Sequence, residues 1–186
     1  MTTKENILVL GFIGSPRRNG NTEILVDEVL KGAKQGGART EKIILNDLTI
    51  HPCQACNACV KTNVCKYDDD MKDIVVKMRE SDIWVLGTPI YWWGPTAQIK
   101  AFIDRWYGLS RQLFVGKKII LVLPSGGGGT FYSRHTLGMF EDIIPYLSMK
   151  LIDTILAAGI GSKGEARNVL PLMEKARKAG LEAIKK

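Results

Sequence analysis

Four cysteines stand close together in the chain, spaced Cys53-x2-Cys56-x2-Cys59-x5-Cys65. Thiolates are soft ligands, and a Cys-x2-Cys-x2-Cys run is typical of proteins that bind a [4Fe–4S] cluster. Bacterial ferredoxins place the fourth cysteine three residues on and follow it with proline, whereas here Lys66 follows the last cysteine. The spacing therefore predicts a [4Fe–4S] cluster held by all four cysteines, in a pattern that differs from ferredoxin.

Two other uses of these cysteines stay open. Structural zinc usually takes two separated Cys-x2-Cys hooks, not three cysteines in a row, but zinc is still an alternative. Free or redox-active thiols are the other, because a reducing cytoplasm disfavours disulfides. The chain has only two histidines, His51 and His135, and no Ser/His/Asp arrangement near a nucleophile elbow, so a hydrolase is unsupported.

A second candidate for chemistry is the run Gly-Ser-Pro-Arg-Arg-Asn-Gly-Asn-Thr at residues 14–22, which leads into an expected helix. Free backbone N–H groups and the helix dipole make such a helix start an anion site. Ser15, Asn21 and Thr22 can donate hydrogen bonds there, and Arg17 can pair with a phosphate. The run lacks the Gly-Lys-Ser/Thr ending of a Walker loop. A plain helix cap with surface arginines is the alternative.

Two further loops offer surfaces for a flat ligand. Residues 88–95 contain the consecutive aromatics Tyr91, Trp92 and Trp93, which neighbouring positions of one strand cannot all bury. Such side chains can flank a planar ring, and the same residues can also form a subunit contact. Residues 124–130 contain four consecutive glycines, whose exposed amides permit close approach to a ring system. A merely flexible loop is the alternative there.

Alternating strand and helix patterns position these loops. Strands are expected over residues 6–11, 40–45, 83–86, 118–123 and 151–158. Helical spacing of apolar residues separates them, as in Val26, Val29, Leu30 and Ala33. This alternation predicts a parallel α/β sheet covered on both faces, with strand order 2-1-3-4-5. Ligands bind at the switch point beside strands 1 and 3, where the loops after strands 1, 3 and 4 meet.

The later helices are expected around four apolar sets. These are Met71, Ile74, Val75 and Met78; Ile99, Phe102, Ile103 and Trp106; Phe140, Ile143, Ile144 and Leu147; and Val169, Leu172, Met173 and Ala176. Pro145 should kink or end the third of these helices. The three aspartates at 68–70 stand at the start of the first, where carboxylates act as caps on the helix dipole.

Composition is that of an ordinary soluble globular protein, with 45% hydrophobic and 24% charged residues. We expect one domain over residues 1–186, with a cysteine-rich insertion at about 46–68. No stretch approaches the ~18 apolar residues that a membrane span needs, and a cytoplasmic location is expected. The net charge of +7 comes from scattered basic residues, which argues against a nucleic-acid partner.

Residues 14–22, together with Thr-Pro-Ile-Tyr at 88–91 and Lys-Ala-Phe-Ile-Asp-Arg at 100–105, resemble the NADPH-dependent FMN reductase group of flavodoxin-like proteins. The resemblance spans essentially the whole chain and implies a flavodoxin-like three-layer sandwich that binds FMN. By this resemblance the FMN phosphate would be held by Ser15, Arg17, Asn21 and Thr22. The isoalloxazine would be lined by Pro89, Ile90, Tyr91, Trp92, Trp93 and Gly94. Its far side would be closed by Ser125, Gly126 and Gly127.

The cysteine run within this fold resembles the iron-sulfur flavoproteins of anaerobic microbes, a branch of the same group. That branch implies an FMN-dependent oxidoreductase that relays electrons from ferredoxin or a similar donor to a small acceptor such as oxygen or peroxide. The flavin carries the chemistry, so no catalytic acid or base is required. The alternatives are an NAD(P)H-dependent reductase of quinones, nitro compounds or free FMN without a functional cluster, and a non-catalytic flavin redox module.

The resemblance also implies a homodimer or homotetramer. The cysteine run follows strand 2, an edge strand in the expected order, whereas the flavin ring should lie over strands 3 and 4. A partner's cysteine loop could come closer to the ring than the chain's own. Trp92 and Trp93 would supply apolar contact for it.

Overall fold

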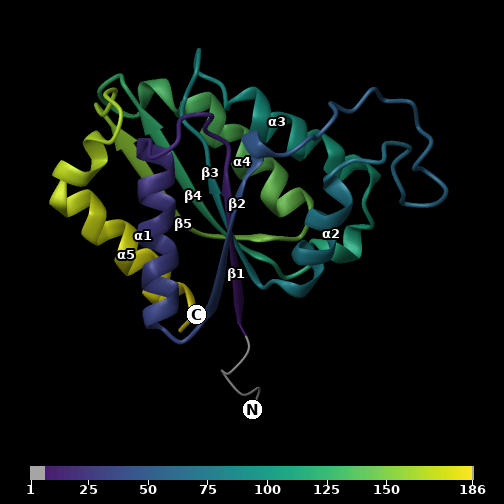
Figure 1. Cartoon of the computed structure of the whole chain (residues 1–186), viewed down its shortest axis with the longest axis horizontal. Coiled ribbons are helices and arrows are strands. Elements are labelled where there is room, and N and C mark those ends of the chain that lie inside the picture. Colours follow the sequence, from purple (N-terminus) through teal and green to yellow (C-terminus); the bar gives the residue numbers. More distant parts are fainter. Residues whose placement is uncertain (1–6, 186) are drawn as a thin grey trace.

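The computed structural model describes residues 7–185, which build one five-stranded sheet (Figure 1). Its strands are β1 (Leu8–Ile13), β2 (Arg39–Ile44), β3 (Ile83–Gly87), β4 (Lys118–Ser125) and β5 (Lys150–Ala158). All neighbouring pairs are parallel, and the order is β2-β1-β3-β4-β5. The predicted flavodoxin-like topology is therefore confirmed.

The central strands of the sheet extend further toward its carboxyl edge than the sequence pattern predicts. The first strand was expected over 6–11, but β1 runs on to Ile13, and Asn6 lies outside the described residues. Phe12 and Ile13 are both buried, one on each face of the sheet, which is why the strand continues past Gly11. Likewise β4 continues to Ser125. The predicted loops therefore begin at the very end of the sheet.

Helices cover both faces of the sheet. On one face lie α1 (Asn21–Gln35) and α5 (Leu170–Ala183); on the other lie α2 (Met71–Glu80), α3 (Ala97–Asp104) and α4 (Arg134–Tyr146) (Figure 1). Short 3-10 turns are η2 (Leu45–Asp47), η3 (Arg105–Gly108), η4 (Arg111–Leu113), η5 (Thr130–Tyr132) and η6 (Glu165–Asn168). Two hydrophobic cores result, one on each face, as a parallel sheet requires.

Two helix ends differ from the sequence pattern. Trp106 was expected in the third helix, but α3 ends at Asp104 and Trp106 is buried in η3. Pro145 lies inside α4, which ends one residue later at Tyr146, so the proline marks the end of that helix as predicted. The tighter turn of η3 becomes important below, because it carries Arg105 and Gly108.

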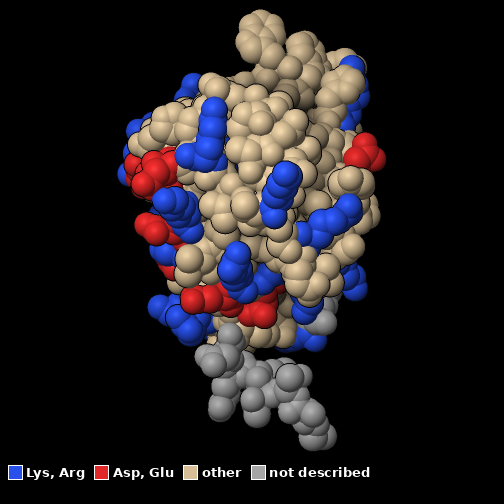
Figure 2. Space-filling view, turned by 90° about the vertical axis from the view of Figure 1, so that its right-hand side faces the viewer, with Lys and Arg blue, Asp and Glu red and all other residues tan. Residues whose placement is uncertain are grey.

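Residues 48–70 contain no helix or strand, and this cysteine segment projects from the side of the molecule beyond α2 (Figure 1). Figure 2 views the molecule from the side of this segment. Lys and Arg side chains are scattered over that surface, and Asp and Glu side chains lie among them. Across residues 7–185, no helix combines the length and the apolar character that crossing a membrane would demand.

Candidate functional site

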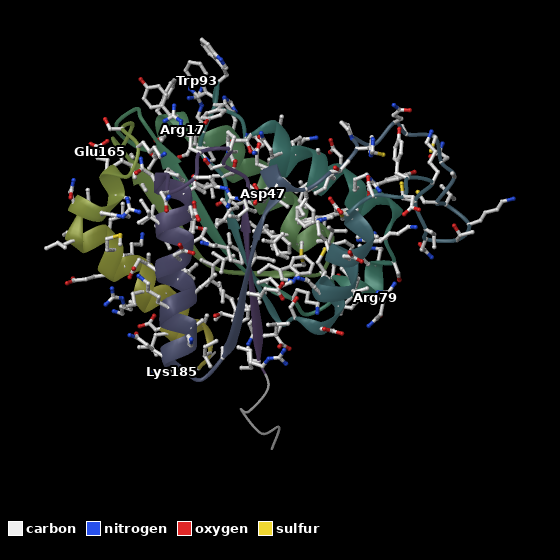
Figure 3. The ribbon with its side chains drawn as sticks, viewed as in Figure 1. Arg17, Asp47, Arg79, Trp93, Glu165 and Lys185 are labelled. Atoms are coloured by element: carbon white, nitrogen blue, oxygen red, sulfur yellow. The ribbon has the colours of Figure 1, made fainter. Side chains whose placement is uncertain are left out.

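Three loops meet in a cleft of about 160 Å³ at the carboxyl edge of β1, β3 and β4. Its walls include most of the residues predicted to hold a cofactor: Ser15, Arg17, Asn21, Thr22, Pro89, Ile90, Tyr91, Ser125 and Gly126. It also includes Gly20 and Pro124 from the predicted loops, and Ile160, Gly161 and Lys163, which the sequence did not indicate. Arg17 and Trp93 lie at this same end of the sheet (Figure 3).

The first loop leaves the start of α1 open toward the cleft. Gly20 precedes the helix in an extended conformation, and no side chain caps the first N–H groups of α1. A Cβ at Gly20 would lie 2.9 Å from the carbonyl oxygen of Arg17, so the tight turn here requires glycine. Ser15 is buried and accepts the N–H of Arg17 at 3.2 Å. Uncapped N–H groups at the positive end of a helix dipole suit an anion such as a phosphate.

Buried threonine hydroxyls tie the first loop to the loop after β3. The Thr96 hydroxyl donates to the Gly14 carbonyl at 2.5 Å, and the Thr96 N–H donates to the Thr88 hydroxyl at 3.0 Å. The Gly14 N–H also donates to the Gly87 carbonyl at 2.8 Å. Because Thr88 and Thr96 are almost fully buried, these bonds fix the two loops relative to each other.

Asn21 has a different contact from the one expected of it. Its side-chain amide donates to the carbonyls of Ile160 and Ser162 at 3.1 and 2.9 Å, and its oxygen accepts the Ala166 N–H at 3.1 Å. These bonds use the side chain to hold the loop after β5 against α1. They bring Gly161 and Lys163 to the cleft, where Arg17 Nη1 lies 3.5 Å from the Gly161 carbonyl. The glycines at 159, 161 and 164 were the sequence signal for this fourth loop.

The consecutive aromatics form a tight turn rather than a continuous wall. Tyr91 and Gly94 exchange two backbone hydrogen bonds of 2.9 and 3.0 Å across it. Trp92 and Trp93 occupy the left-handed region, with φ of 51° and 62°, so the three side chains point in different directions. Tyr91 lines the cleft, Trp92 is 91% exposed, and Trp93 stacks on Tyr132 with ring centroids 5.9 Å apart.

The glycine loop, residues 124–130, contributes to the cleft through its first three positions. Ser125 and Gly126 line the cleft, and the Ser125 hydroxyl donates to the Gly127 carbonyl at 3.0 Å. A Cβ at Gly127 would lie 2.3 Å from the ring of Tyr132. Gly127 therefore leaves room for the ring of Tyr132, which packs against Trp93. Trp93, Gly94 and Gly127 thus belong to the rim of the cleft.

The four cysteines are free thiols, with Cys53 and Cys56 exposed and Cys59 and Cys65 half-buried. Within the described residues, no three Cys, His, Asp or Glu side chains converge in a metal-binding arrangement. Backbone turns with positive φ at Ala55 and Asn57 separate the cysteines. Four unbonded thiols in one exposed segment fit a thiolate-held cluster in kind and number, and the segment would need to rearrange to gather them.

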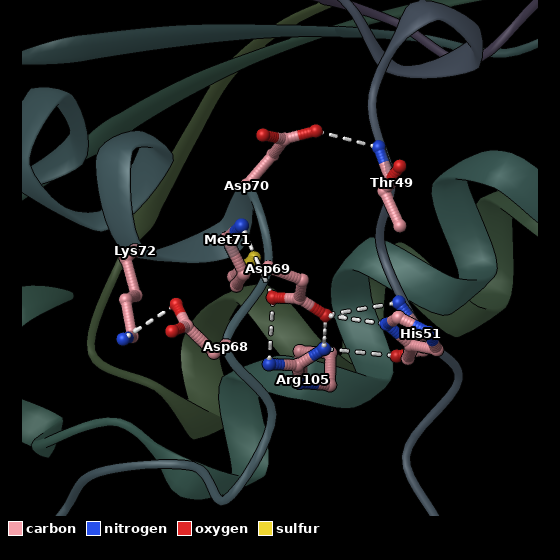
Figure 4. Close-up of polar contacts among 8 residues, drawn as sticks. All are labelled: Thr49, His51, Asp68, Asp69, Asp70, Met71, Lys72 and Arg105. Atoms are coloured by element: carbon pink, nitrogen blue, oxygen red, sulfur yellow. Dashed lines mark hydrogen bonds and ion pairs between the residues drawn. The ribbon is translucent and has the colours of Figure 1, made fainter.

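A buried ion pair closes the base of the cysteine segment (Figure 4). Arg105 Nη1 and Nη2 donate to the two carboxylate oxygens of Asp69 at 2.6 and 3.1 Å, and both side chains are at most 2% exposed. Arg105 Nη1 also donates to the His51 carbonyl at 2.9 Å, and the His51 N–H donates to Asp69 at 3.0 Å. Asp69 was interpreted as a helix cap; it does accept the Met71 N–H at 3.2 Å, but its main partner is Arg105.

Electrostatics favour the charged form of both partners. Burial opposes ionisation of Asp69, but hydrogen bonds from Arg105 and the His51 N–H outweigh it and hold the pKa of the carboxyl below its usual value. Burial likewise opposes the charge of Arg105, while the hydrogen bond and charge of Asp69 raise its pKa. His51 and Asp69, which stand near the two ends of the cysteine segment, are thus joined through one guanidinium.

A more voluminous hollow, about 680 Å³, lies between the free edge of β2 and α2. None of the predicted site residues lines it, and it lies along the edge strand β2, not at the switch point between β1 and β3 where ligands of such sheets bind. Its Glu41 and Lys77 form an ion pair with each other. The smaller cleft at the carboxyl edge is therefore the candidate site.

Comparison with known proteins gives a consistent result. A family described as NADPH-dependent FMN reductase matches residues 7–163. An iron-sulfur flavoprotein of Methanocaldococcus jannaschii is 43% identical over 108 residues, which cover 58% of this chain and 54% of the relative. The matched segment thus spans about half of that relative's length. An iron-sulfur flavoprotein of Methanosarcina thermophila is 36% identical over 135 residues, 72% of this chain and 71% of the relative.

Solved structures share the fold. An NAD(P)H:quinone oxidoreductase from Methanothermobacter marburgensis superposes with a TM-score of 0.77 at 16% identity, covering 96% of this chain and 99% of that one. An FMN-dependent NADH-azoreductase from Bacillus anthracis, solved in complex with FMN, has a TM-score of 0.67 at 13% identity, covering 97% and 98%.

Proposed function

The chain belongs to the iron-sulfur flavoprotein branch of the NADPH-dependent FMN reductase family and is a flavin-dependent oxidoreductase, and from this premise we propose that it holds FMN in the cleft at the carboxyl edge of the sheet. The observation that carries the proposal is the meeting of an uncapped helix start, an aromatic side chain and open glycine backbone in one cleft. These supply an anion site, a ring contact and backbone hydrogen bonds.

The proposed roles follow from where each side chain lies. Ser15, Arg17, Thr22 and the backbone N–H of Asn21 would hold the phosphate, since the Asn21 side chain is already used by the β5–α5 loop. Pro89, Ile90 and Tyr91 would contact the ring on one side, and Ser125 and Gly126 on the other. When bound, FMN supplies one- and two-electron transfer.

The size of the cleft bears on how the flavin would sit. Its 160 Å³ is below the roughly 300–1,000 Å³ of a typical enclosed small-molecule site. The cleft would take the phosphate end, and the ring would lie at the open rim, where a small acceptor can reach it. Trp92, Trp93, Gly94 and Gly127 would then belong to the rim rather than to the enclosed wall.

We expect FMN, and not FAD, when the cofactor is extracted from protein purified with its flavin and chromatographed, because loop 14–22 offers one phosphate site. Arg17→Ala should weaken FMN binding by about 1.5–3 kcal/mol, the range of a charge-assisted hydrogen bond. Arg18→Ala is the matched control, since Arg18 pairs with Asp47 instead of lining the cleft. Equal flavin affinity in parent and Arg17→Ala would place the phosphate elsewhere.

The cysteine segment would hold a [4Fe–4S] cluster through Cys53, Cys56, Cys59 and Cys65, and free thiols agree with the reducing cytoplasm proposed for the protein. Cys65→Ala should lose the cluster's visible absorbance while FMN stays bound, because Cys65 is not among the residues that line the cleft. Iron and sulfide analysis after anaerobic purification measures this. Unchanged iron content in Cys65→Ala would remove it from the ligand set.

The proposal extends to the molecules that donate electrons to the protein and accept electrons from it. A ferredoxin-like donor would deliver electrons singly through the cluster, and a small acceptor would take them from the flavin. NAD(P)H as direct donor is the second candidate, favoured by the match to the NADPH-dependent FMN reductase family. Anaerobic turnover with reduced ferredoxin and with NAD(P)H, in parent and Cys65→Ala, distinguishes them. A ferredoxin activity that survives in Cys65→Ala would contradict the cluster route.

We also propose a homodimer or homotetramer whose contact includes Trp92, since Trp92 is 91% exposed and the adjoining Trp93 packs against the exposed Phe131 and Tyr132, so that apolar side chains gather beside the cleft. Trp92→Glu should lower the molecular mass found by sedimentation and leave the circular dichroism spectrum unchanged. A parent that sediments as a monomer of 20.6 kDa would contradict this proposal.

A further inference from the structure

Arg105 is buried at the base of the cysteine segment and has one N–H without a partner. Its two terminal nitrogens are used by Asp69 and the His51 carbonyl, whereas Nε is buried and has no hydrogen-bond partner among residues 7–185. An unpartnered buried donor costs roughly 1–3 kcal/mol. Such a group calls for an acceptor that completes its hydrogen bonds.

A cysteine lines the same cavity as the guanidinium of Arg105. A cavity of about 230 Å³ lies between the cysteine segment, α2 and η3, and both Cys65 and Arg105 line it together with apolar Val64 and Leu109.

A second half-buried cysteine lies against the same turn. The Sγ of Cys59 is 3.0 Å from where a Cβ of Gly108 would stand, so Cys59 packs closely against this glycine. Arg105 and Gly108 both belong to η3. The two half-buried cysteines, Cys59 and Cys65, therefore both lie beside η3, whereas Cys53 and Cys56 are exposed.

We propose that Arg105 is a positioning residue of the iron–sulfur centre: η3 seats Cys59 and Cys65, and the guanidinium donates an N–H to the sulfur at Cys65. The inference rests on the proposed cluster. A charge-assisted N–H···S bond stabilises the more negative, reduced form of the centre and so raises its reduction potential. The Asp69 carboxylate offsets part of the arginine charge, which leaves the hydrogen bond as the main effect.

The test uses a double variant, Arg105→Gln with Asp69→Asn, which removes the guanidinium without leaving a buried charge unpaired. Its matched control is Arg177→Gln with Glu28→Gln, which neutralises the pair of an arginine with a 3%-exposed glutamate side chain between α5 and α1. Iron and sulfide are measured in anaerobically purified holoprotein, and the cluster potential is measured by EPR-monitored redox titration.

We expect the Arg105/Asp69 double variant either to lose its iron and sulfide or to keep them with a lower potential. A tenfold loss of preference for the reduced form corresponds to about 59 mV for a one-electron couple. The Arg177/Glu28 control should match the parent in both measurements. Arg105→Lys keeps the charge but not the planar fork, and should lie between parent and double variant.

The outcomes test the role of Arg105 separately from the presence of the cluster. A parent with iron and sulfide, and a double variant with the same iron content and potential, would overturn the role of Arg105 and leave the cluster standing. A parent that contains FMN but neither iron nor sulfide would overturn the cluster and this inference with it. If the double variant does not fold, judged by circular dichroism and flavin content, a potential for Arg105→Lys equal to the parent's overturns the role.

Discussion

Gly180→Ala is expected to destabilise the fold by about 3 kcal/mol or more, at the upper end of what overpacking costs. Gly180 lies where α5 crosses α1, and a Cβ there would stand 1.9 Å from the Val29 carbonyl oxygen and 2.8 Å from the Ala33 nitrogen. Both obstacles are backbone atoms, so no side-chain rotation relieves the clash. Gly32 makes the reciprocal approach, with its Cβ position 1.8 Å from the Arg177 carbonyl oxygen.

Gly138→Ala is the matched control, because Gly138 is also helical, in α4, and a Cβ there meets nothing within 4 Å. It should stabilise the protein by about 0.8–1 kcal/mol through helix propensity alone. Urea unfolding followed by circular dichroism measures both variants. A midpoint for Gly180→Ala at or above the parent's would show that the two helices can separate at little cost, contrary to the packing described above.

The second large effect is expected from Arg105→Met, which should cost about 3–5 kcal/mol because it leaves the buried carboxylate of Asp69 without its partner. The Arg105/Asp69 double variant described above, which has no unpaired charge, should recover most of this loss. Urea midpoints at pH 7 measure all three proteins. A single variant as stable as the double variant would mean that Asp69 is not held ionised in the fold.

The same pair gives an expected pH dependence. The folded pKa of Asp69 lies below its usual value, so the group contributes stability above the unfolded pKa of about 3.9 and loses it as pH falls through the folded value. The stability difference between the parent and the double variant should therefore shrink in acid. A difference that is the same at pH 7 and in acid below the folded pKa would contradict the assignment.

The strand order and the three loops could be predicted because local patterns carry them: strand and helix periods alternate, and the unusual loops follow strands 1, 3 and 4. The Asp69–Arg105 pair could not. Three consecutive aspartates before a helix satisfy the rule for caps, and Arg105 follows an amphipathic helix, where an arginine normally reaches solvent. Only the tighter turn of η3 directs it inward.

The conformation of the aromatic turn and the directions of the cysteine side chains could not be predicted from the sequence, for a related reason. A left-handed backbone is expected at glycine or asparagine, so the pattern gave no sign that Trp92 and Trp93 adopt it and diverge. The spacing of the cysteines fixes which residues are available, but positive φ at Ala55 and Asn57 decides where each thiol points. The β5–α5 loop could not be predicted because its contacts come through the side chain of Asn21, which the loop pattern assigns to phosphate binding.

The two ends of the cysteine segment meet each other in the fold. The Thr49 N–H donates to the Asp70 carboxylate at 2.6 Å, and the Asp70 N–H returns a bond to the Thr49 carbonyl at 3.2 Å. Closing a loop across such a junction depends only weakly on the number of residues enclosed, about 0.6 kcal/mol for each doubling. We therefore expect the flavin-binding framework to tolerate insertions and deletions between His51 and Asp69 that leave their contacts with Arg105 in place, and this junction is where a foreign redox or metal-binding peptide could be inserted without redesigning the sheet.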